Sequence, residues 1–423
     1  MMLPPLWSPE VEARVQAEAR DMDKQERAPE VKFCTRCVVS SQRPRIVFDD
    51  EGVCSACRYA ERKKAGIDWK ARADELRALL AKYRKDHAYD VIVPCSGGKD
   101  SSTVAYRLKH EFGMTPLCIK WAPHIYTEIG RRNMENFNHA GFDVIEATPN
   151  GLLHRKLARL GLEFYGDPFL PFIYGQLAWP MNAAKWFGIP LVFYGENGEA
   201  EYGGDPAAND KPCWSTEDWT RVYMKGASFE KLLFLGRQLG AISEQEQRQA
   251  SMFYRLPDFD REFMGGFGPT KETRPQFHWL GYYLPWHPQG NYYHAAEHTG
   301  FEANEERSQG TYSKYASLDD KLDGLHYYLG YIKFGIGRCT SDAAHEVRDG
   351  EIGREEAVAL VGRYDGEFPT RHLDDCLAYL GMDRMQLDRV IDRFRPEHLW
   401  ERTHDEGWRL KHTVYADAKS EAA

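Results

Sequence analysis

The chain has 423 residues, of which 42% are hydrophobic and 28% are charged, and its formal net charge is −9. This length allows two or three domains with buried cores. The acidic balance argues against nucleic acid as the main partner, because phosphate contacts need concentrated lysine and arginine. No apolar run approaches the ~20 residues that span a bilayer, and the first residues lack the order of a signal peptide. We therefore expect a cytoplasmic protein that does not act in a membrane.

Two cysteine pairs, "CTRC" and "CSAC", follow a charged segment (1–30) that we expect to form a helical arm. The four cysteines are Cys34, Cys37, Cys54 and Cys57. Each pair fits a tight turn, and two such turns at this spacing point four thiolates at one Zn²⁺. We therefore predict a zinc ribbon over 31–60, with a strand and a turn at Asp50–Gly52 between the pairs.

The metal at these cysteines has alternatives. An iron–sulfur cluster uses the same four thiolates, and unligated core cysteines are the remaining interpretation. A site with four protein ligands has no open coordination position, so we expect the metal to be structural. The other five cysteines are scattered, and the odd total of nine does not suit a disulfide framework.

Residues 61–87 are predicted to be a helical connector, and strands alternate with helices over 88–215. The predicted strands are 89–95, 115–121, 142–149 and 189–195. The predicted helices are 101–113, 125–141, 152–162 and 172–188. This alternation predicts right-handed crossovers and a parallel, doubly wound α/β sheet with helices on both faces. Residues 216–423 are predicted to form a mainly helical substrate or partner region.

The stretch "SGGKDSS" (96–102) ends the first predicted strand and opens the first helix. Gly97 and Gly98 allow the backbone to approach a ligand closely. Successive N–H groups at a helix N-terminus form an anion-binding nest. The hydroxyls that can donate to phosphate oxygens are those of Ser96, Ser101 and Ser102. The loop is therefore predicted to bind phosphate at the carboxyl edge of the sheet, where ligands of such sheets lie.

The charged residues of this loop indicate a phosphate bound together with a metal. Lys99 adds positive charge, whereas Asp100 would repel bare phosphate unless Mg²⁺ joined its carboxylate to the phosphate oxygens. The Walker pattern G-x-x-x-x-G-K-[ST] is absent. A glycine turn whose serine and aspartate merely cap the helix is the structural alternative, and it accounts for only one hydroxyl. ATP with Mg²⁺ is therefore the predicted ligand.

The loop S-G-G-K-D-S after a strand resembles the pyrophosphate loop of the ATP pyrophosphatase (PP-loop) superfamily, over roughly 88–205. The resemblance implies an adenine nucleotide alpha hydrolase-like sheet. It also implies enzymes that adenylate a carbonyl-type oxygen, release pyrophosphate, and let nitrogen or sulfur displace AMP. Its phosphate-binding residues would be Ser96, Gly97, Gly98, Asp100 and Ser101, with Mg²⁺ on Asp100. Lys99, Asp100 and Ser101 are thus the candidate catalytic residues, and Lys120 is a candidate for the α-phosphate.

A wider set of motifs is more specific. The zinc-ribbon segment, the loop, "WAPHIYT", "YGENGEAEYGG" and "KFGIGRCTSDAAHEVRDG" together resemble the N-acetyl sugar amidotransferase family, over nearly the whole chain after residue 32. That family acts in the biosynthesis of lipopolysaccharide O-antigen sugars and of nonulosonic acids such as pseudaminic acid. The resemblance implies that an acetamido group of an N-acetylated, nucleotide-linked sugar becomes an acetamidino group. It further implies a separate glutaminase subunit that supplies ammonia.

Two motifs supply further candidate residues. In "YGENGEAEYGG" the family resemblance places Glu196 and Asn197 in the nucleotide site, while Glu199 and Glu201 are candidates for a second Mg²⁺ or for sugar hydroxyls. An acidic surface turn is the alternative. In "TSDAAHEVRDG" three residues at i, i+3 and i+6 share a helical face and are candidates for acceptor recognition, against a helix cap and solvated face as the alternative. These are Asp342, His345 and Arg348.

Two other functions remain open. A tRNA thiolation enzyme of the PP-loop superfamily would need a reactive cysteine beside the loop and a basic surface, and the net charge and the placement of the cysteine pairs argue against it. A non-catalytic zinc-ribbon subunit that only binds nucleotide would have no need for Asp100. An ATP-dependent, AMP-forming carbon–nitrogen ligase is therefore the favoured prediction.

Overall fold

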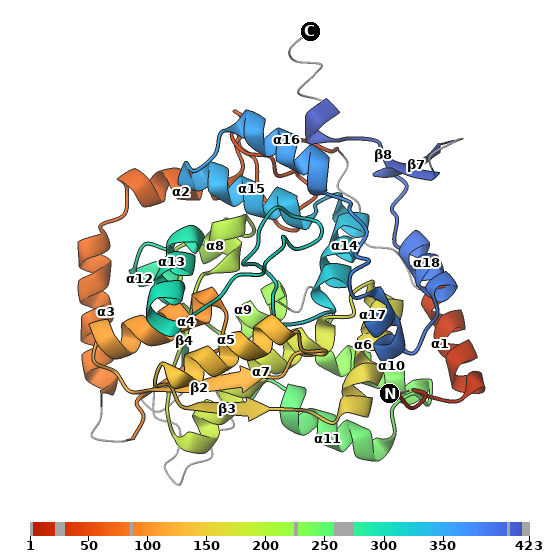
Figure 1. The fold of residues 1–423 in the computed structure, drawn as a ribbon, viewed down its shortest axis with the longest axis horizontal. Coiled ribbons are helices and arrows are strands. Elements are labelled where there is room, and N and C mark those ends of the chain that lie inside the picture. The colour runs from red at the N-terminus through yellow and green to blue at the C-terminus, as the bar shows by residue number, and fades with distance from the viewer. Residues whose placement is uncertain are drawn as a thin grey trace.

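The structure, a computed structural model, describes residues 3–21, 30–84, 88–223, 227–257, 275–403 and 407–416. Within these residues a six-stranded sheet lies among helices (Figure 1). Its strands are β1 (Val91–Pro94), β2 (Pro116–Trp121), β3 (Val144–Ala147), β4 (Leu191–Tyr194), β5 (Cys213–Trp214) and β6 (Gln276–Trp279). Their order is β3-β2-β1-β4-β6-β5, and every pairing is parallel except that of β5 with β6. The predicted four strands are present, and two more extend the sheet.

Both faces of the sheet are buried. Along β1, Val91 and Val93 join one apolar core, whereas Ile92 joins the other. Successive side chains of a strand point to opposite faces, so a parallel sheet that is covered on both sides needs an unbroken apolar run. The sequence "VIVP" provides that run.

Helices cover each face. The core that contains Val91 includes residues of α3 (Trp69–Tyr83), α4 (Lys99–Tyr106), α5 (Glu128–His139) and α12 (Leu280–Tyr283). The core that contains Ile92 includes residues of α1 (Pro9–Asp21), α6 (Gly151–Tyr165), α7 (Leu170–Phe187), α10 (Phe229–Gln238), α11 (Glu244–Tyr254), α14 (Asp323–Phe334), α17 (Leu373–Leu380) and α18 (Arg384–Arg393).

The other elements of the described chain lie beside these layers. They are α2 (Ser55–Ala65), α8 (Gly198–Tyr202), α9 (Thr216–Asp218), α13 (Pro288–Thr299), α15 (Arg338–Asp349), α16 (Arg354–Tyr364), a 3₁₀ turn (Pro206–Ala208), two π-helical segments (Arg107–Glu111 and Trp219–Tyr223) and a hairpin of β7 (Trp400–Thr403) and β8 (Gly407–Leu410). Figure 1 shows α15 and α16 next to α2, on the side of the molecule away from β2 and β3.

The sequence explains where several helices begin and end. The side chain of Asn150 accepts hydrogen bonds from the backbone N–H groups of Leu152 and Leu153, which begins α6. Gly188, with a φ of 66°, ends α7 in the left-handed conformation that glycine adopts most readily. The helix predicted at 172–188 is thus present as α7, and Gly188 ends it.

Two expectations need correction. The strand predicted between the cysteine pairs is reduced to a single bridge between Phe48 and Cys54, while the turn after it is kept by Gly52, with a φ of 72°. The sheet is also not confined to 88–215, because β6 pairs with β4 from well beyond that segment. Residues 22–29 of the predicted arm and 85–87 of the predicted connector lie outside the described residues.

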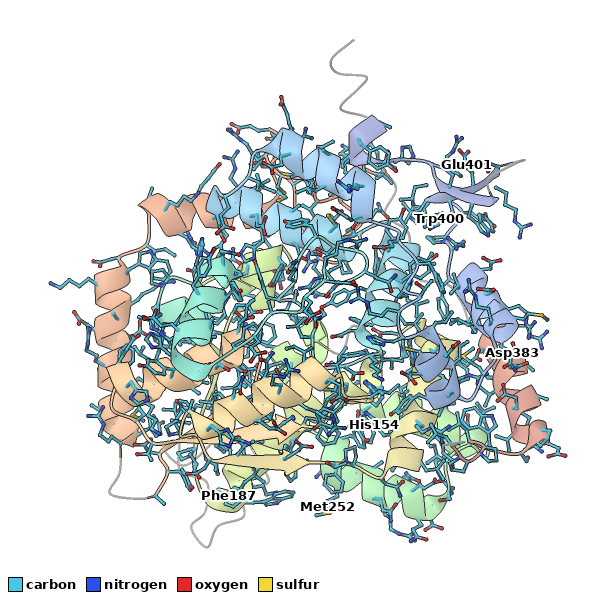
Figure 2. The ribbon with its side chains drawn as sticks, in the orientation of Figure 1. His154, Phe187, Met252, Asp383, Trp400 and Glu401 are labelled. Atoms are coloured by element: carbon cyan, nitrogen blue, oxygen red, sulfur yellow. The ribbon has the colours of Figure 1, made fainter. Side chains whose placement is uncertain are left out.

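The outer surface near the start of β4 carries exposed apolar side chains. Figure 2 shows His154 inside the molecule and Phe187 and Met252 at its edge. Phe187 is the last residue of α7, so this surface lies at the amino edge of the sheet.

None of the helices formed by the described residues combines the length and the apolar character that a membrane span requires.

Candidate functional site

The four cysteines of the ribbon form one buried cluster. All four sulfur atoms lie within 4.8 Å of one another, and the Sγ–Sγ distances from Cys34 to Cys57 and from Cys37 to Cys54 are both 3.8 Å. A tetrahedron with Zn–S bonds of about 2.3 Å has edges of about 3.8 Å. The backbone N–H groups of Cys37 and Cys54 also point at the Cys34 sulfur, at 3.5 and 3.3 Å. The cluster can therefore bind zinc as four thiolates.

The ribbon packs on α15 and α16. The cysteines share an apolar core with Cys339 and Ala343 of α15. From the same helix Arg348 places Nη1 3.9 Å from the Cys37 sulfur, and Arg354 of α16 donates to the Cys37 carbonyl oxygen at 3.2 Å. The ribbon is thus tied to the C-terminal helices by both apolar and polar contacts.

A cavity of about 640 Å³ opens at the carboxyl ends of β1 and β4. The loop after β1 lines it with Ser96, Gly97, Gly98, Lys99, Asp100 and Ser101. The backbone of the loop lies so close to α5 that a Cβ at Gly97 would be 3.0 Å from the backbone of Met134. With a φ of 77° as well, this position requires glycine.

The loop is held in place by its own side chains and by α13. The Ser96 hydroxyl accepts a hydrogen bond from the Gly98 N–H at 3.3 Å, and the Ser101 hydroxyl donates to the Gly98 carbonyl at 3.2 Å. Asp100 accepts from Lys99 Nζ at 2.5 Å and from the Asn291 amide at 3.0 Å. Sequence analysis missed Asn291, because no local pattern connects a residue in α13 with the loop.

Glu196 follows β4 and faces the same cavity. Burial, together with the negative charge of Asp100, raises the pKa of Glu196 to about 8, although Lys99 opposes the shift. Two carboxyl groups at an anion-binding loop suit a divalent cation, which would favour the ionised form of Glu196.

Replacing Glu196 with glutamine is expected to change how stability depends on pH. Between about pH 4.5 and pH 8 the folded chain holds a proton that the unfolded chain has lost, so the free energy of unfolding falls as the pH rises. Glutamine mimics the protonated acid, so Glu196→Gln should be more stable than the original protein at pH 8.5 by ~1–3 kcal/mol, with little difference below pH 4.5. Urea unfolding without Mg²⁺ or nucleotide measures both values.

The matched control for this experiment is Glu135→Gln, on an exposed position of α5. It should change stability equally at the two pH values. A stability gain for Glu196→Gln that is the same at both pH values would contradict the proposed effect of burial on this carboxyl group.

Three predicted nucleotide-site residues do not line the cavity. Ser102 is fully buried. Lys120 is buried and forms an ion pair with Glu146 at 3.1 Å. Asn197 caps α8, where its side chain accepts from the Glu199 N–H at 3.1 Å. Lys120 and Asn197 are thus engaged with the protein itself, whereas the buried Ser102 hydroxyl has no hydrogen-bond partner among the described residues.

The acidic residues of α8 contact the ribbon and α2. Glu199 does line the cavity, but its carboxylate accepts two hydrogen bonds from Arg45, at 2.6 and 2.9 Å. Glu201 lies outside the lining, buried against Lys63 at 2.7 Å and His345 at 3.3 Å. The surface-turn alternative does not describe this segment, because its carboxylates connect elements that are far apart in the sequence.

The candidate acceptor residues of α15 also bind the protein itself. Asp342 accepts from Arg338 and from the Thr311 hydroxyl at 2.7 Å, His345 reaches Glu201, and Arg348 reaches the ribbon. None of the three lines the cavity. They connect α15 to the elements around it.

Sequence analysis missed several residues that line the cavity. They are Arg43, Arg45, Asp319, Asp323, Tyr327 and Arg338. One signal is conformational: Arg45 and Ser317 are the two non-glycine residues of the described chain with a positive φ, and both line this cavity. Such backbone strain concentrates at functional sites.

A second cavity of about 570 Å³ adjoins the first. The two share a wall, which consists of Ser317, Leu318, Asp323, Tyr327 and Arg338. Burial and the charges of Asp319 and Asp320 raise the pKa of Asp323 above its usual range. The shared wall therefore carries a carboxyl group with a raised pKa, that of Asp323, and the guanidinium of Arg338.

The C-terminal part of the chain matches a known family of proteins. Residues 309–415 match the family model described as "LPS biosynthesis protein WbpG-like, C-terminal domain". The match connects the chain with lipopolysaccharide biosynthesis. The matched segment includes Asp323, Tyr327 and Arg338 of the cavity wall and the helices that carry the ribbon. A search of curated proteins found no match.

Proposed function

We propose that the chain is an ATP-dependent amidotransferase of lipopolysaccharide sugar biosynthesis. It would convert the acetamido group of an N-acetylated sugar into an acetamidino group and release AMP and pyrophosphate. The observation that carries this proposal is the loop 96–101, which lines the cavity at the carboxyl ends of the parallel strands β1 and β4. The C-terminal match to lipopolysaccharide biosynthesis supports the sugar substrate.

The residues around the loop suit a nucleoside triphosphate bound with Mg²⁺. The N–H groups at the start of α4, the hydroxyls of Ser96 and Ser101, and Lys99 would bind the β- and γ-phosphates. Asp100 and Glu196 are the carboxylates that would hold Mg²⁺, whose charge would stabilise the departing pyrophosphate. The negative charge of Asp100 contributes to the raised pKa of Glu196, which supports placing both carboxyl groups at one ion.

The proposed reaction must activate the amide carbonyl of the sugar, which is a poor electrophile. The amide oxygen of the sugar attacks the α-phosphorus of ATP, the bond to the β-phosphate oxygen breaks, and pyrophosphate leaves. Ammonia then adds to the imidate carbon, the carbon–oxygen bond breaks, and the former amide oxygen departs with AMP. The protein would position the substrates and stabilise charge, and the reaction requires that water be kept from hydrolysing the activated amide.

The reaction needs two substrates and a source of ammonia. The two adjoining cavities provide room for a nucleotide beside a nucleotide-linked sugar. Ammonia would come from a separate glutaminase, because the five cysteines outside the metal cluster lack the setting of a glutaminase nucleophile. The metal of the ribbon would be structural, since its four thiolates leave no open position.

The test supplies ATP, Mg²⁺, ammonium and a UDP- or CMP-linked N-acetylated sugar, and analyses the products by mass. The expected products are AMP and a sugar that has exchanged one oxygen atom for an NH group. ADP in place of AMP would refute the mechanism. AMP formed with tRNA but with none of the sugars would favour a thiolation enzyme, and nucleotide binding without any turnover would favour a non-catalytic subunit.

A further inference from the structure

The ribbon reaches into the cavity through the segment between its cysteine pairs. Arg43 and Arg45 belong to that segment, and both line the cavity. The close approach depends on Gly203, where a Cβ would lie 3.0 Å from Ile46 and 3.2 Å from Ala56. Gly203, which follows α8, therefore allows the ribbon to pack closely at this position.

The lysine and arginine side chains of this cavity differ in their partners. Lys99 pairs with Asp100 at 2.5 Å, Arg45 with Glu199 at 2.6 Å, and Arg338 with Asp342 at 3.1 Å. These three cations are therefore already neutralised by carboxylates in the absence of a ligand.

Arg43 is different. Its Nε donates to the Gly203 carbonyl oxygen, and its guanidinium lies 5.8 Å from the centre of the Tyr202 ring. Among the residues that the structure describes, no carboxylate lies within 4.0 Å of it, and Nη1 and Nη2 have no hydrogen-bond partner. The outer edge of its guanidinium, which carries these two nitrogens, is therefore available to a ligand.

The surroundings of Arg43 favour an anion. Burial and the neighbouring positive charges of Arg348 and Arg45 lower the pKa of Arg43 to about 10, although Glu199 opposes the shift. The guanidinium thus remains charged at neutral pH, in a place where it is partly shielded from solvent and meets repulsion. A negatively charged ligand would relieve both costs.

We propose that Arg43 binds a phosphoryl group of the ligand in this cavity, so that the zinc ribbon forms part of the nucleotide site. The inference rests on the proposed function, which places phosphorylated substrates here. A planar guanidinium with both terminal NH2 groups unbonded matches two oxygens of a phosphate. The phosphoryl group belongs either to ATP or to the diphosphate of the sugar nucleotide, and binding measurements distinguish these sources.

The experiment compares Arg43→Gln and Arg43→Lys with the original protein by calorimetry. Two ligands are titrated separately: α,β-methylene-ATP with Mg²⁺, and UDP-N-acetylglucosamine. Arg43→Gln should weaken binding of one of them ~10–100-fold, the value of a hydrogen-bonded charge pair. Arg43→Lys keeps the positive charge but cannot donate two parallel hydrogen bonds, so its affinity should fall less than that of Arg43→Gln. The ligand whose affinity falls identifies the source of the phosphoryl group.

The matched control is Arg36→Gln, an exposed arginine of the same ribbon that does not line the cavity. It should leave both affinities unchanged. The zinc content of every variant is measured as well, and equal zinc contents show that a lost affinity does not come from a damaged ribbon.

The outcomes separate the inference from the function on which it rests. Unchanged affinities in both Arg43 variants, next to an original protein that binds, would overturn the inference alone. An original protein that binds neither ligand would overturn the proposed function as well. If a variant does not fold, an arginine-specific dicarbonyl reagent is applied to the unchanged protein. Arg43 should then be protected by one ligand, and labelling that neither ligand slows would refute the inference.

Discussion

Replacing Asp100 with alanine is expected to lower AMP formation by at least ~10²–10³-fold, as the loss of a group that stabilises transition-state charge does in other enzymes. In the proposed reaction this carboxylate holds the metal that offsets the charge on the departing pyrophosphate. The side chain already faces the cavity, with one oxygen toward Lys99 and the other toward Asn291. AMP release with ammonium and an N-acetylated sugar nucleotide measures the effect.

The fold should survive this substitution. Asp100 lies in the first turn of α4, where a negative charge stabilises a helix by only ~0.3–1 kcal/mol. A melting temperature close to that of the original protein is therefore expected. Asp74→Ala, on the exposed face of α3, is the matched control and should retain full activity. Turnover that persists in Asp100→Ala would contradict the metal-binding role assigned to this residue.

Removing zinc from the four-cysteine cluster is expected to lower the stability of the protein strongly. Binding of structural zinc to small cysteine sites is worth ~10–16 kcal/mol, and without it such sites do not fold. Here the four cysteines also share a core with Cys339 and Ala343, so their loss exposes part of α15. Cys54→Ser, or a strong chelator, should release zinc and lower the melting temperature. Metal analysis together with thermal unfolding measures both.

The control for the metal experiment is Cys213→Ser, which changes a partly exposed cysteine of β5 outside the cluster. It should keep its zinc and its melting temperature. A metal that proves to be iron, or one that changes oxidation state during turnover, would refute the assignment of a structural zinc. If Arg43 binds phosphate, the chelated protein should also lose affinity for the ligand identified by the Arg43 variants.

The elements of the sheet that local sequence specifies were predictable. The runs around β1, β2, β3 and β4 are mainly apolar, with Lys120 in β2 and Glu146 in β3, and they are bounded by polar or glycine residues, so their positions follow from the pattern. β6 was not predictable in this way. Its four residues, "QFHW", contain two polar side chains, and it becomes a strand because it pairs with β4 across a long stretch of chain.

The candidate site also has one part that the sequence predicted and one part that it did not. The loop 96–101 was predictable because its glycines, hydroxyls and charges are adjacent in the sequence and lie between a strand and a helix. The contact between Arg45 and Glu199 was not, since the two residues belong to segments that the sequence pattern treats as independent. Sequence analysis therefore identified Glu199 as a candidate ligand for metal or sugar, whereas the structure places an arginine on its carboxylate.

The packing of the ribbon on α15 has a consequence for biosynthesis of the protein itself. Cys34 and Cys339 belong to one buried cluster although most of the chain lies between them. While the polypeptide emerges from the ribosome, the cysteines appear early, but the surface on which they pack appears only near the end of translation. The ribbon must remain partly uncovered for most of synthesis. A transcript cut short before α15 would yield a chain whose ribbon lacks the surface on which it packs.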